Sequence, residues 1–566
     1  INSVTTKAPA ADPTFTGTLA APTINASTKL QVNGTDVITN ARALSNITSI
    51  DATTAAAIGA GGVGGGGSIE LTASGSITAG DLVGITPSGS VTKLKAKSTK
   101  NTVETNISNR TYLGSKYLGS NKIIFLYMTA SNTLVARVGT ISGTSISFGS
   151  SQQVNSDAGT GTGVAYVDVV YDSNTGNVVF FWSVGSDSDK GYLRAASISG
   201  TTLTFGSSVN VASNSALFNG FLGWDPDTQR GLAVYSISTT FKYSLFSLGG
   251  TGSRTITLEQ DNQGISGDPR LDGGKMAYDT TADKMVIVFR NASTNALKYI
   301  CADIGSSSVT FGSEVSSGTA TNAFNFSIIF IPTLNKVGFA YKNDSNVLKA
   351  GVVTLSGTTV TVNETTLLDH GNVNDYSNIS FAAEPDGTCL ILYGDSDSSL
   401  TDKVRCVIGS FSGTNFVSSL SDFTLIMEDS GGNETRSAEF EFFYTDSTNN
   451  KFVLLCYVSK ADGTTATNGY YAYTIPGTDD IVAYDNWIGI ASQSVSDGAS
   501  VDVTVQGGLN ENQSSLDVGR KYYLQDDATI TTTFKDDRLI GISTAATKLF
   551  LTNGSIIIGP TGFNNN

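Results

Sequence analysis

Histidine, proline and cysteine are scarce in this sequence. Among its 566 residues there are one histidine (His370), 10 prolines and 4 cysteines. A single histidine excludes most acid–base and catalytic-triad chemistry, because those reactions usually need an imidazole. The cysteines stand mostly in apolar, strand-like runs without metal-ligand spacing, so we expect buried free thiols, which suit folding in a reducing cytoplasm.

Charged residues and long apolar runs are also few. Charged residues make up 15% of the chain, and the formal net charge is −15. Phosphate binding needs clustered Lys and Arg, so we expect no nucleic-acid partner, and anionic membrane surfaces are disfavoured for the same reason. No stretch approaches the roughly 18 apolar residues of a membrane helix, so we expect no membrane insertion. No signal peptide is visible, but the chain opens at Ile1 rather than Met, so nothing follows from that.

Glycine, serine, threonine and asparagine are abundant, together with short β-branched runs. There are 61 glycines, and hydrophobic residues make up 39% of the chain. This composition favours β-structure with many tight turns, and the length favours two to four domains. The glycine-rich run "GAGGVGGGG" lacks the Lys-Ser/Thr pair of a phosphate-binding loop, and we expect no cofactor.

Two landmarks recur along most of the chain. The first is an aromatic residue that ends an apolar run, at successive steps of 55, 53, 54, 52, 52 and 64 residues. These landmark aromatics are Tyr127, Trp182, Tyr235, Phe289, Tyr341, Tyr393 and Tyr457. The second landmark follows about 20 residues later and is a Ser-Gly turn before a further strand, as in "ISGTSISFGS" (141–150) and "ISGTTLTFGS" (198–207).

The landmarks divide each unit into four short strands, and seven such units are typical of an all-β, seven-bladed β-propeller. Polar segments such as "DSNTG" after Tyr171 are predicted to be hairpin turns, because Asp and Asn bond their own backbone and Gly adopts left-handed geometry freely. The spacing Asp172-x-Asn174-x-Gly176 resembles a fragment of a calcium loop, but the remaining ligands are missing, so we interpret it as a turn.

The seventh unit lacks a fourth strand after "GYYAYTIPG" (469–477). The segment "SVTKLKAKSTKNT" (90–102) precedes the first unit and is free to supply one. We therefore predict a propeller over 91–480 with a closing strand near 91–97, which pairs with 470–474 and removes an exposed sheet edge.

Residues 1–68 do not resemble a globular domain. They contain small residues, scattered prolines and short apolar fragments, and end in a Gly-rich linker, so we expect an extended segment. "KAPAADPTFTGTLAAPT" (7–23) resembles a phrase common in bacteriophage tail fibres, and "LQVNGTDVI" (30–38) is similar to the shaft segments that follow it.

A second resemblance is split in two. "TASGSITAGDLVGITPSGSVTKL" (72–94) is similar to the opening of a small β-domain of phage structural proteins, and 486–551 resembles its remainder, with "DGASVDVTVQG", "GRKYYL" and "IGISTAATKL" in the expected order. The expected domain halves are 69–90 and 481–566. A propeller inserted between them departs from the family pattern, but an insert whose termini meet is tolerated.

The two resemblances imply a phage tail fibre or receptor-binding protein. Such fibres are usually homotrimers, which contact other virion tail or baseplate proteins. The family also implies a location on the virion, with assembly in the host cytoplasm and action outside the cell. The implied function is attachment to a host surface glycan, lipopolysaccharide or protein.

In a propeller, the connections between blades and those between second and third strands share one rim. Here these connections are long and rich in Asp, Asn, Ser and Gly, which can bond sugar hydroxyls, with an occasional Tyr for stacking. The candidate ligand-binding residues are Asp187, Asp189, Tyr192, Asp268, Arg270, Asn374, Tyr376, Asp395, Asp397 and Asn433. Asp-x-Asp pairs in turns are usually solvated, so we expect no metal site.

Enzymatic cleavage of polysaccharide would need two carboxylates about 5–10 Å apart. Glu439 and Glu441 would share one side of an innermost strand, and Asp168 would hold a comparable place in the second unit. The sialidase-type "S-x-D-x-G-x-T-W" box is in none of the seven turns, so we predict no enzyme activity. The alternatives to attachment are a purely structural virion fibre or decoration protein, a depolymerase and a bacterial adhesin.

Overall fold

The structure is a computed structural model, and the residues it describes are 30–32, 35–38 and 67–552 with internal gaps. The gaps are 106–113, 130–132, 157–163, 185–189, 213–216, 238–239, 251, 266–268, 292–295, 318–325, 344, 346, 369–378, 397–401, 428–433, 447, 449, 461–468 and 536–537. In parts of some strands, among them 269–272, 394–396 and 434–441, only the backbone is described.

The chain divides into two units, residues 1–65 and 66–566. In the first unit, β1 (Leu30–Val32) and β2 (Thr35–Ile38) form an antiparallel hairpin. This hairpin lies within the segment that resembles a fibre shaft. The rest of the predicted shaft segment up to residue 66 lies outside the described residues.

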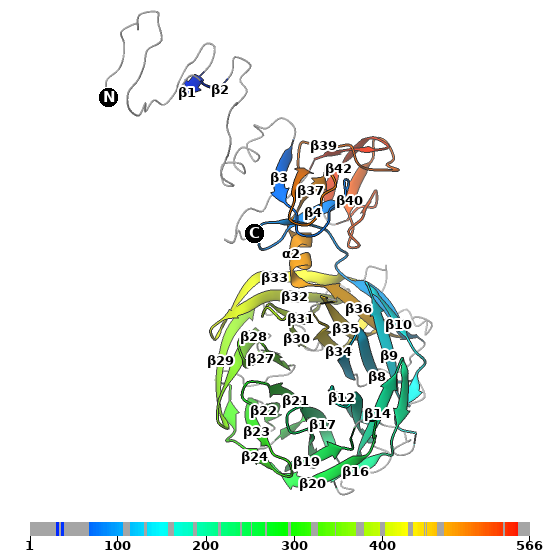
Figure 1. Cartoon of the computed structure of the whole chain (residues 1–566), viewed down its shortest axis with the longest axis vertical. Helices are drawn as coiled ribbons and strands as arrows, with labels where there is room; N and C mark the ends of the chain where they lie inside the picture. Colours follow the sequence, from blue (N-terminus) through cyan, green and yellow to red (C-terminus); the bar gives the residue numbers. More distant parts are fainter. Residues whose placement is uncertain are drawn as a thin grey trace, which may run out of the picture. The chain divides into compact units, whose positions relative to one another are not determined.

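The second unit contains seven antiparallel four-stranded sheets that follow one another around a ring (Figure 1). Blades 1 to 3 are β7 (Gly114–Gly119), β8 (Lys122–Met128), β9 (Leu134–Ser142) and β10 (Ser145–Phe148); β12 (Val164–Asp172), β13 (Asn177–Val184), β14 (Lys190–Ser199) and β15 (Thr202–Phe205); β17 (Phe218–Asp225), β18 (Arg230–Ile237), β19 (Thr240–Leu248) and β20 (Ile256–Gly264). Short strands β11 (Gln152–Gln153) and β16 (Val209–Val211) pair with the third strands of blades 1 and 2.

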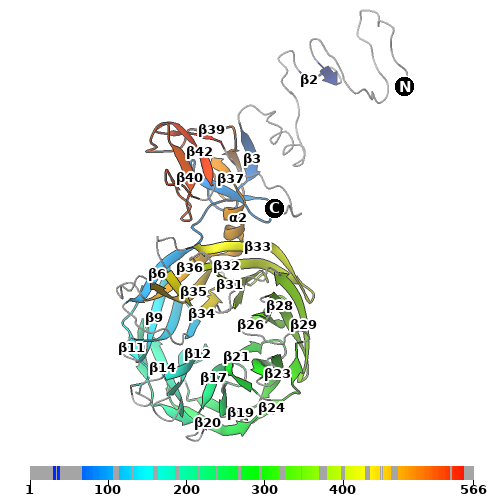
Figure 2. The ribbon, with the colours of Figure 1, turned by 180° about the vertical axis from the view of Figure 1, so that it is seen from behind.

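The ring continues through blades 4 to 6 (Figure 2). They are β21 (Pro269–Asp279), β22 (Lys284–Asn291), β23 (Leu297–Ile304) and β24 (Val309–Phe311), with β25 (Val315–Ser316) beside β23; β26 (Phe326–Ile331), β27 (Lys336–Lys342), β28 (Leu348–Ser356) and β29 (Thr359–Leu368); β30 (Ser380–Ala383), β31 (Cys389–Ser396), β32 (Asp402–Ser412) and β33 (Asn415–Met427). The all-β propeller with seven blades is therefore confirmed.

Blade 7 closes the ring with a strand from before blade 1. Its order is β34 (Glu434–Tyr444), β35 (Lys451–Lys460), β36 (Gly469–Pro476) and β6 (Thr99–Thr105). Thr474 pairs with Thr99 and Gly469 with Thr105, in antiparallel register. The propeller therefore spans 99–476, and the prediction of a closing strand at 91–97 was wrong by about eight residues. The segment near 91 is used elsewhere, because Val91 is buried in the core of the small β-domain.

The hairpin turns between first and second strands are formed as the residue types predict. In blade 2, the Asp172 side chain accepts a hydrogen bond from Asn174 N–H (3.0 Å), and Gly176 has a φ of +73°. Asp225 and Asp279 accept the equivalent bonds in blades 3 and 4. These side-chain bonds to the turn backbone agree with the interpretation as turns.

The landmark aromatics are core residues, and each is at most 3% exposed. The second strands that carry them are buried on both faces, because each blade packs against a neighbour on either side. Apolar clusters accordingly lie between adjacent blades, as between β8 and β13 or between β22 and β27. Tyr127 illustrates this packing, since its ring lies 5.0 Å from that of Tyr470 in blade 7.

The small β-domain combines strands from both sides of the propeller. One five-stranded sheet has the order β3 (Ser68–Thr72), β38 (Ser500–Thr504), β37 (Trp487–Ala491), β4 (Leu82–Ile85) and β5 (Val91–Lys93). The other has the order β39 (Leu509–Asn510), β43 (Lys548–Leu551), β42 (Leu539–Ala545), β40 (Lys521–Leu524) and β41 (Ile530–Thr531). Because β37 pairs with β4, the two sequence halves form one sheet, and the propeller is inserted between them.

Two segments connect the β-domain to the propeller, residues 94–98 and the helix α2 (Thr478–Asp485). The N-terminus of α2 is held by Glu384 in blade 6, whose carboxylate accepts bonds from Thr478 N–H and Thr478 Oγ1, both 2.8 Å. Lys95 forms an ion pair with Asp480 of the helix at 2.8 Å. Glu384 therefore fastens the helix to the propeller, and Lys95 joins it to the other connecting segment.

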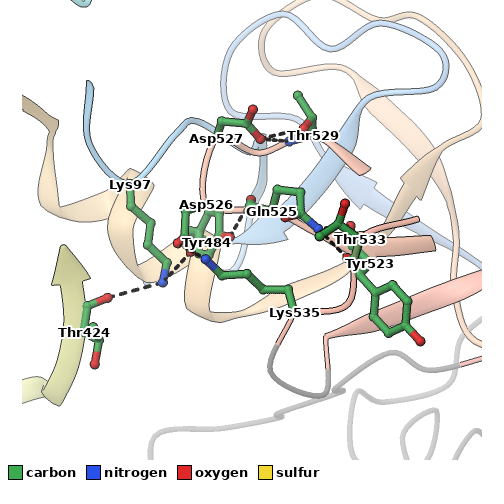
Figure 3. A network of polar contacts seen from close by, with 10 residues as sticks. All are labelled: Lys97, Thr424, Tyr484, Tyr523, Gln525, Asp526, Asp527, Thr529, Thr533 and Lys535. Atoms are coloured by element: carbon green, nitrogen blue, oxygen red, sulfur yellow. Dashed lines mark hydrogen bonds and ion pairs between the residues drawn. The ribbon is translucent and has the colours of Figure 1, made fainter. Parts of the chain in front are cut away.

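A buried lysine occupies the centre of this junction (Figure 3). Lys97 Nζ lies 3.1 Å from Asp526 Oδ1 of the β-domain and donates to the Thr424 carbonyl of blade 6 at 3.3 Å. It also lies over the rings of Phe423 (4.8 Å) and Tyr484 (5.0 Å). Burial, followed by the nearby Arg538 charge, lowers the pKa of Lys97. One ammonium group thus contacts blade 6, α2 and the β-domain together.

Candidate recognition rim and inner wall of the propeller

The propeller has two rims, and both connections to the β-domain leave it at one of them. Antiparallel order places the turns between first and second strands, and between third and fourth strands, on one rim, which we call the turn rim. The chain enters at Thr99 and leaves at Pro476, both at this rim. Glu384, which caps α2, lies in the turn between β30 and β31 of the same rim. The opposite loop rim carries the connections predicted to bind ligands.

The structure describes only part of the predicted ligand-binding set. Seven of the ten residues lie outside the described residues, namely Asp187, Asp189, Asp268, Asn374, Tyr376, Asp397 and Asn433. Arg270 and Asp395 lie in β21 and β31, where only the backbone is described. Tyr192 lies in β14 and is 8% exposed, with its ring stacked on Trp182 at 5.6 Å, so Trp182 covers one face of the predicted stacking surface.

Tyrosine–carboxylate pairs near the loop rim were missed from the sequence. In blade 1, Tyr127 Oη donates to Glu104 Oε2 of the closing strand at 3.2 Å. Arg137 approaches the same carboxylate at 3.6 Å and donates to the Gly149 carbonyl at 2.8 Å. Burial, followed by the Glu104 charge, raises the pKa of Tyr127, so the phenol stays protonated and donates. The pair therefore joins the first and seventh blades.

Blade 5 has a second pair of this kind. Tyr341 Oη donates to Glu364 Oε2 at 2.8 Å, and Lys349 Nζ lies 3.3 Å from Glu364 Oε1. Tyr299 of blade 4 is fully buried nearby, and burial, with the charges of Tyr341 and Glu364, raises its pKa. Its hydroxyl has no hydrogen-bond partner among the described residues.

A third pair in blade 3 includes a serine. Tyr235 Oη and Ser244 Oγ are 2.7 Å apart, and Ser244 Oγ donates to Asp261 Oδ1 at 2.6 Å. Asp261 also accepts from Ala212 N–H of the preceding blade at 3.0 Å. The sequence signal for all three pairs was a tyrosine at the landmark position with an acid on an outer strand. These groups can bond hydroxyls, but the bonds described here already link blades 1 and 7 and blades 2 and 3, and hold two strands to a third within blade 5.

The inner wall of the ring is formed by the first strands of the blades, which contact one another in turn. In blade 2, Asp168 accepts hydrogen bonds from Val169 N–H and from Leu222 N–H of blade 3, both 2.7 Å. Burial raises the pKa of this carboxyl, against the charges of Lys275 and Lys116 and the two amide bonds. The carboxylate therefore ties two neighbouring first strands together.

In blade 5 a serine hydroxyl makes the equivalent hydrogen bond to the next first strand. Ser327 lies at the same register position as Asp168, since each pairs with the residue before the landmark aromatic. Its Oγ accepts from Phe381 N–H of blade 6 at 3.2 Å. A side chain at this position therefore bonds the next blade whether or not it is ionisable, which indicates a structural role for Asp168.

The strand register shows that Asp168 does not occupy the same position in its blade as Glu439 or Glu441 in blade 7. In blade 7, Phe440 pairs with Cys456, the residue before the landmark Tyr457, so Phe440 corresponds to Asp168. Glu441 and Glu439 occupy the flanking positions of β34, where only the backbone is described. The expectation that Asp168 holds a comparable place was therefore wrong, because the offset is one residue and neighbouring positions face opposite sides of a strand.

Asp168→Asn is expected to change the pH dependence of stability. Because the folded pKa lies above the ordinary 3.8, the stabilisation from protonated Asp168 is complete below 3.8 and is lost as pH rises through the folded value. Urea unfolding across this window should therefore show that the free energy of unfolding of the wild type falls relative to that of the Asn variant as pH rises. Asp168→Ser, which copies blade 5, should give the same trend, whereas parallel curves for wild type and variants would contradict it.

The cysteines are free and buried, as expected. Burial raises the pKa of the Cys301 thiol to about 11, so little of it ionises at neutral pH. Among the described residues, no group of three His, Cys, Asp or Glu could hold a metal ion. Searching the same residues for a helix long and apolar enough to cross a bilayer also gives none.

Comparisons with known proteins give structural similarity only. No family model matches the chain, and no curated protein matches it. Among solved structures it is similar to AofleA from Arthrobotrys oligospora (12% identity, 58% of this chain and 91% of that chain, TM-score 0.37). It is also similar to a protein from Lactobacillus plantarum (12%, 63% and 97%, 0.41) and to the Aleuria aurantia lectin AAL (12%, 57% and 98%, 0.36). At these identities and scores, no ligand or activity transfers to this chain.

Proposed function

We propose that this chain is a phage virion fibre subunit that attaches to the host cell surface through the loop rim of its propeller. The class of receptor is a surface glycan or lipopolysaccharide, bound without covalent chemistry. The subunit works as a homotrimer together with other tail or baseplate proteins. The proposal starts from the two sequence resemblances, in residues 7–38 and in the split β-domain.

The observation that carries the proposal is that both connections between the propeller and the β-domain lie at the turn rim. Glu384 holds the start of α2 at that rim, Lys95 pairs with Asp480 of α2, and Lys97 bonds the outer strand β33 of blade 6 at Thr424. The loop rim lies at the other ends of the same strands. The connections predicted to bind ligands, rich in Asp, Asn, Ser and Tyr, join strand ends at this rim, and the strands of the blades would hold those ends in place for a ligand.

The charge of the chain limits the receptor chemistry. A net charge of −15 does not oppose a neutral glycan, but it disfavours simple adhesion to an anionic envelope. Binding to an anionic glycan would therefore need cations or specific donors. Weak single-site contacts would be strengthened when several copies on one virion bind together.

Removing side chains from the loop rim tests this proposal. We expect the wild type to bind components of an array of bacterial glycans and lipopolysaccharides. A variant with Asn374, Tyr376, Asp395 and Asp397 changed to Ala should lose at least about tenfold in affinity, which corresponds to roughly 1.4 kcal/mol. The matched control changes Ser306, Ser307 and Ser308, which are exposed on the turn rim, and should bind like the wild type.

Other outcomes would replace the proposal. Absence of binding both to the array and to intact bacteria would favour the purely structural virion role. Equal binding by the loop-rim variant, with loss in the turn-rim control, would place the receptor on the other rim. Release of reducing ends from a polysaccharide by the wild type would indicate a depolymerase instead.

A further inference from the structure

The second sheet of the β-domain has an unusually apolar outer face. In the described part of the chain, five large apolar side chains are exposed, and four of them lie between residues 509 and 550. They are Leu509 (43%), Val518 (66%), Phe534 (67%) and Phe550 (40%). The fifth, Val417, lies in the propeller. Such a concentration is uncommon on a soluble domain without a partner surface.

Strand register places two of these side chains, Leu509 and Phe550, on one face of the sheet. Leu509 pairs with Phe550, and Phe550 pairs with Ile542. Directly opposed residues of an antiparallel pair lie on the same side of a sheet, so the three form a row. Leu549 and Leu551, which flank Phe550, are fully buried and face the core. The row therefore points away from the core.

A second row extends the apolar face. Tyr523 pairs with Leu539, and the ring of Phe534 lies 5.4 Å from that of Tyr523. Lys521, which pairs with Ile542, and Lys548, which is two residues before Phe550 and pairs with Glu511, are charged residues on the same side of the sheet. We define the outer apolar face by these two rows, namely Leu509, Phe550, Ile542, Leu539, Tyr523 and Phe534.

The chain itself supplies an apolar segment next to this face. The described residues end at Thr552, one residue after β43, and β43 carries Phe550. The 14 residues that follow, "NGSIIIGPTGFNNN", contain three consecutive isoleucines and Phe563 and carry no charged side chain. An uncharged segment with four large apolar residues therefore begins at the edge of an apolar surface.

We propose that the C-terminal segment, residues 553–566, docks on the outer apolar face of its own β-domain. Its isoleucines and Phe563 would cover Phe550, Ile542 and Tyr523. An extended segment of this length reaches roughly 45 Å, whereas the five strands are together about 20 Å wide. Tethering one residue from the sheet gives the segment a millimolar-range effective concentration there. The inference is independent of the proposed function.

Truncation tests the docking in the otherwise complete chain. A variant that ends at Thr552 should bind the apolar dye 8-anilinonaphthalene-1-sulfonate severalfold more than the wild type, because the face is uncovered. The matched control ends at Phe563, loses only three asparagines and should behave like the wild type. Ile557→Asp in the full-length chain should reproduce the truncation. Equal dye binding by all four proteins would overturn the proposal.

A designed disulfide distinguishes the segment of the same chain from a second copy. Ile542→Cys with Ile557→Cys should form a disulfide within one chain under mild oxidation, since the four native thiols are buried. Mass measurement without reduction reports the outcome. A disulfide between chains would assign the outer apolar face to a second copy, and absence of any disulfide would show that the segment does not lie there. Either result overturns the proposal.

Discussion

Val103→Asp is expected to open the propeller ring. Val103 is 1% exposed in the closing strand β6 and packs in the apolar cluster between blades 7 and 1 with Phe125 and Leu455. A carboxylate at this position would be buried among apolar side chains, and Arg137, which donates to the Val103 carbonyl and already approaches Glu104, offsets only part of its charge, so we expect a loss of about 3 kcal/mol or more in the free energy of unfolding. Denaturant titration followed by tryptophan fluorescence measures the loss.

A control for this experiment is available one residue away. Thr102 is exposed in the same strand, so Thr102→Asp introduces the same charge without burying it and should change the unfolding free energy by less than about 0.5 kcal/mol. Equal losses for the two variants would mean that the added charge, and not the buried contact, is responsible. A stable Val103→Asp variant would show that β6 is dispensable for the ring.

The second large effect is expected at the buried lysine of the junction. Lys97→Ala removes the ion pair with Asp526, the bond to the Thr424 carbonyl and the contacts with Phe423 and Tyr484. Losing one partner of a fully buried pair costs about 3–5 kcal/mol. The Asp526 side chain is 32% exposed and keeps Lys535 as a partner, so we expect about 2–3 kcal/mol here. Protease cleavage at 94–98 should become faster.

Lys95→Ala serves as the comparison, because Lys95 pairs with Asp480 but its side chain is 59% exposed. An exposed pair of this kind contributes about 0–1 kcal/mol. The double variant Lys97→Met with Asp526→Asn should recover part of the loss, because no carboxylate is left without its partner. Similar losses in the free energy of unfolding for Lys95→Ala and Lys97→Ala would contradict the assignment of Lys97 as the residue that contributes most to the junction.

This junction bears on attachment because it fixes how the propeller is held. Burial alone would raise the pKa of Asp526, but the charges of Lys97 and Lys535 outweigh it and lower the pKa. The carboxylate therefore stays ionised at neutral pH and keeps the junction charged and paired. In the proposed function, a rigid junction means that a force acting on a receptor contact at the loop rim passes to the β-domain with little relative motion of the two domains.

The sequence predicted the propeller because its repeat has a local cause. Each second strand is buried on both faces and therefore reads as an apolar run, while each hairpin turn needs residues such as Asp172 and Gly176. Both signals depend on neighbours within about ten residues, so the apolar runs and turn residues recur in the sequence once per blade. Counting the landmark aromatics consequently gave the number of blades.

Residues far apart in the sequence decided the rest. Segments 91–97 and 99–105 look alike as candidates for the closing strand, and only packing distinguishes them. Val91 is covered by the β-domain core, whereas Val103 fits between Phe125 and Leu455. The offset between Asp168 and Glu441 also appears only in the strand pairing, where Asp168 and Phe440 oppose the residues before the landmark aromatics. A shift of one residue reverses the faces of a strand and leaves little trace in composition.

The sequence by itself determined that the chain forms seven four-stranded modules between two halves of a small β-domain, because hydrophobic period and turn chemistry are local properties. The tertiary structure alone decided which strand closes the ring, which rim carries the β-domain and which charges are buried together. Lys97 and Asp526 are 429 residues apart in the chain, and they meet because the inserted ring returns the chain to where it left. Contacts of that kind depend on how the modules pack, and packing is a property of the whole fold.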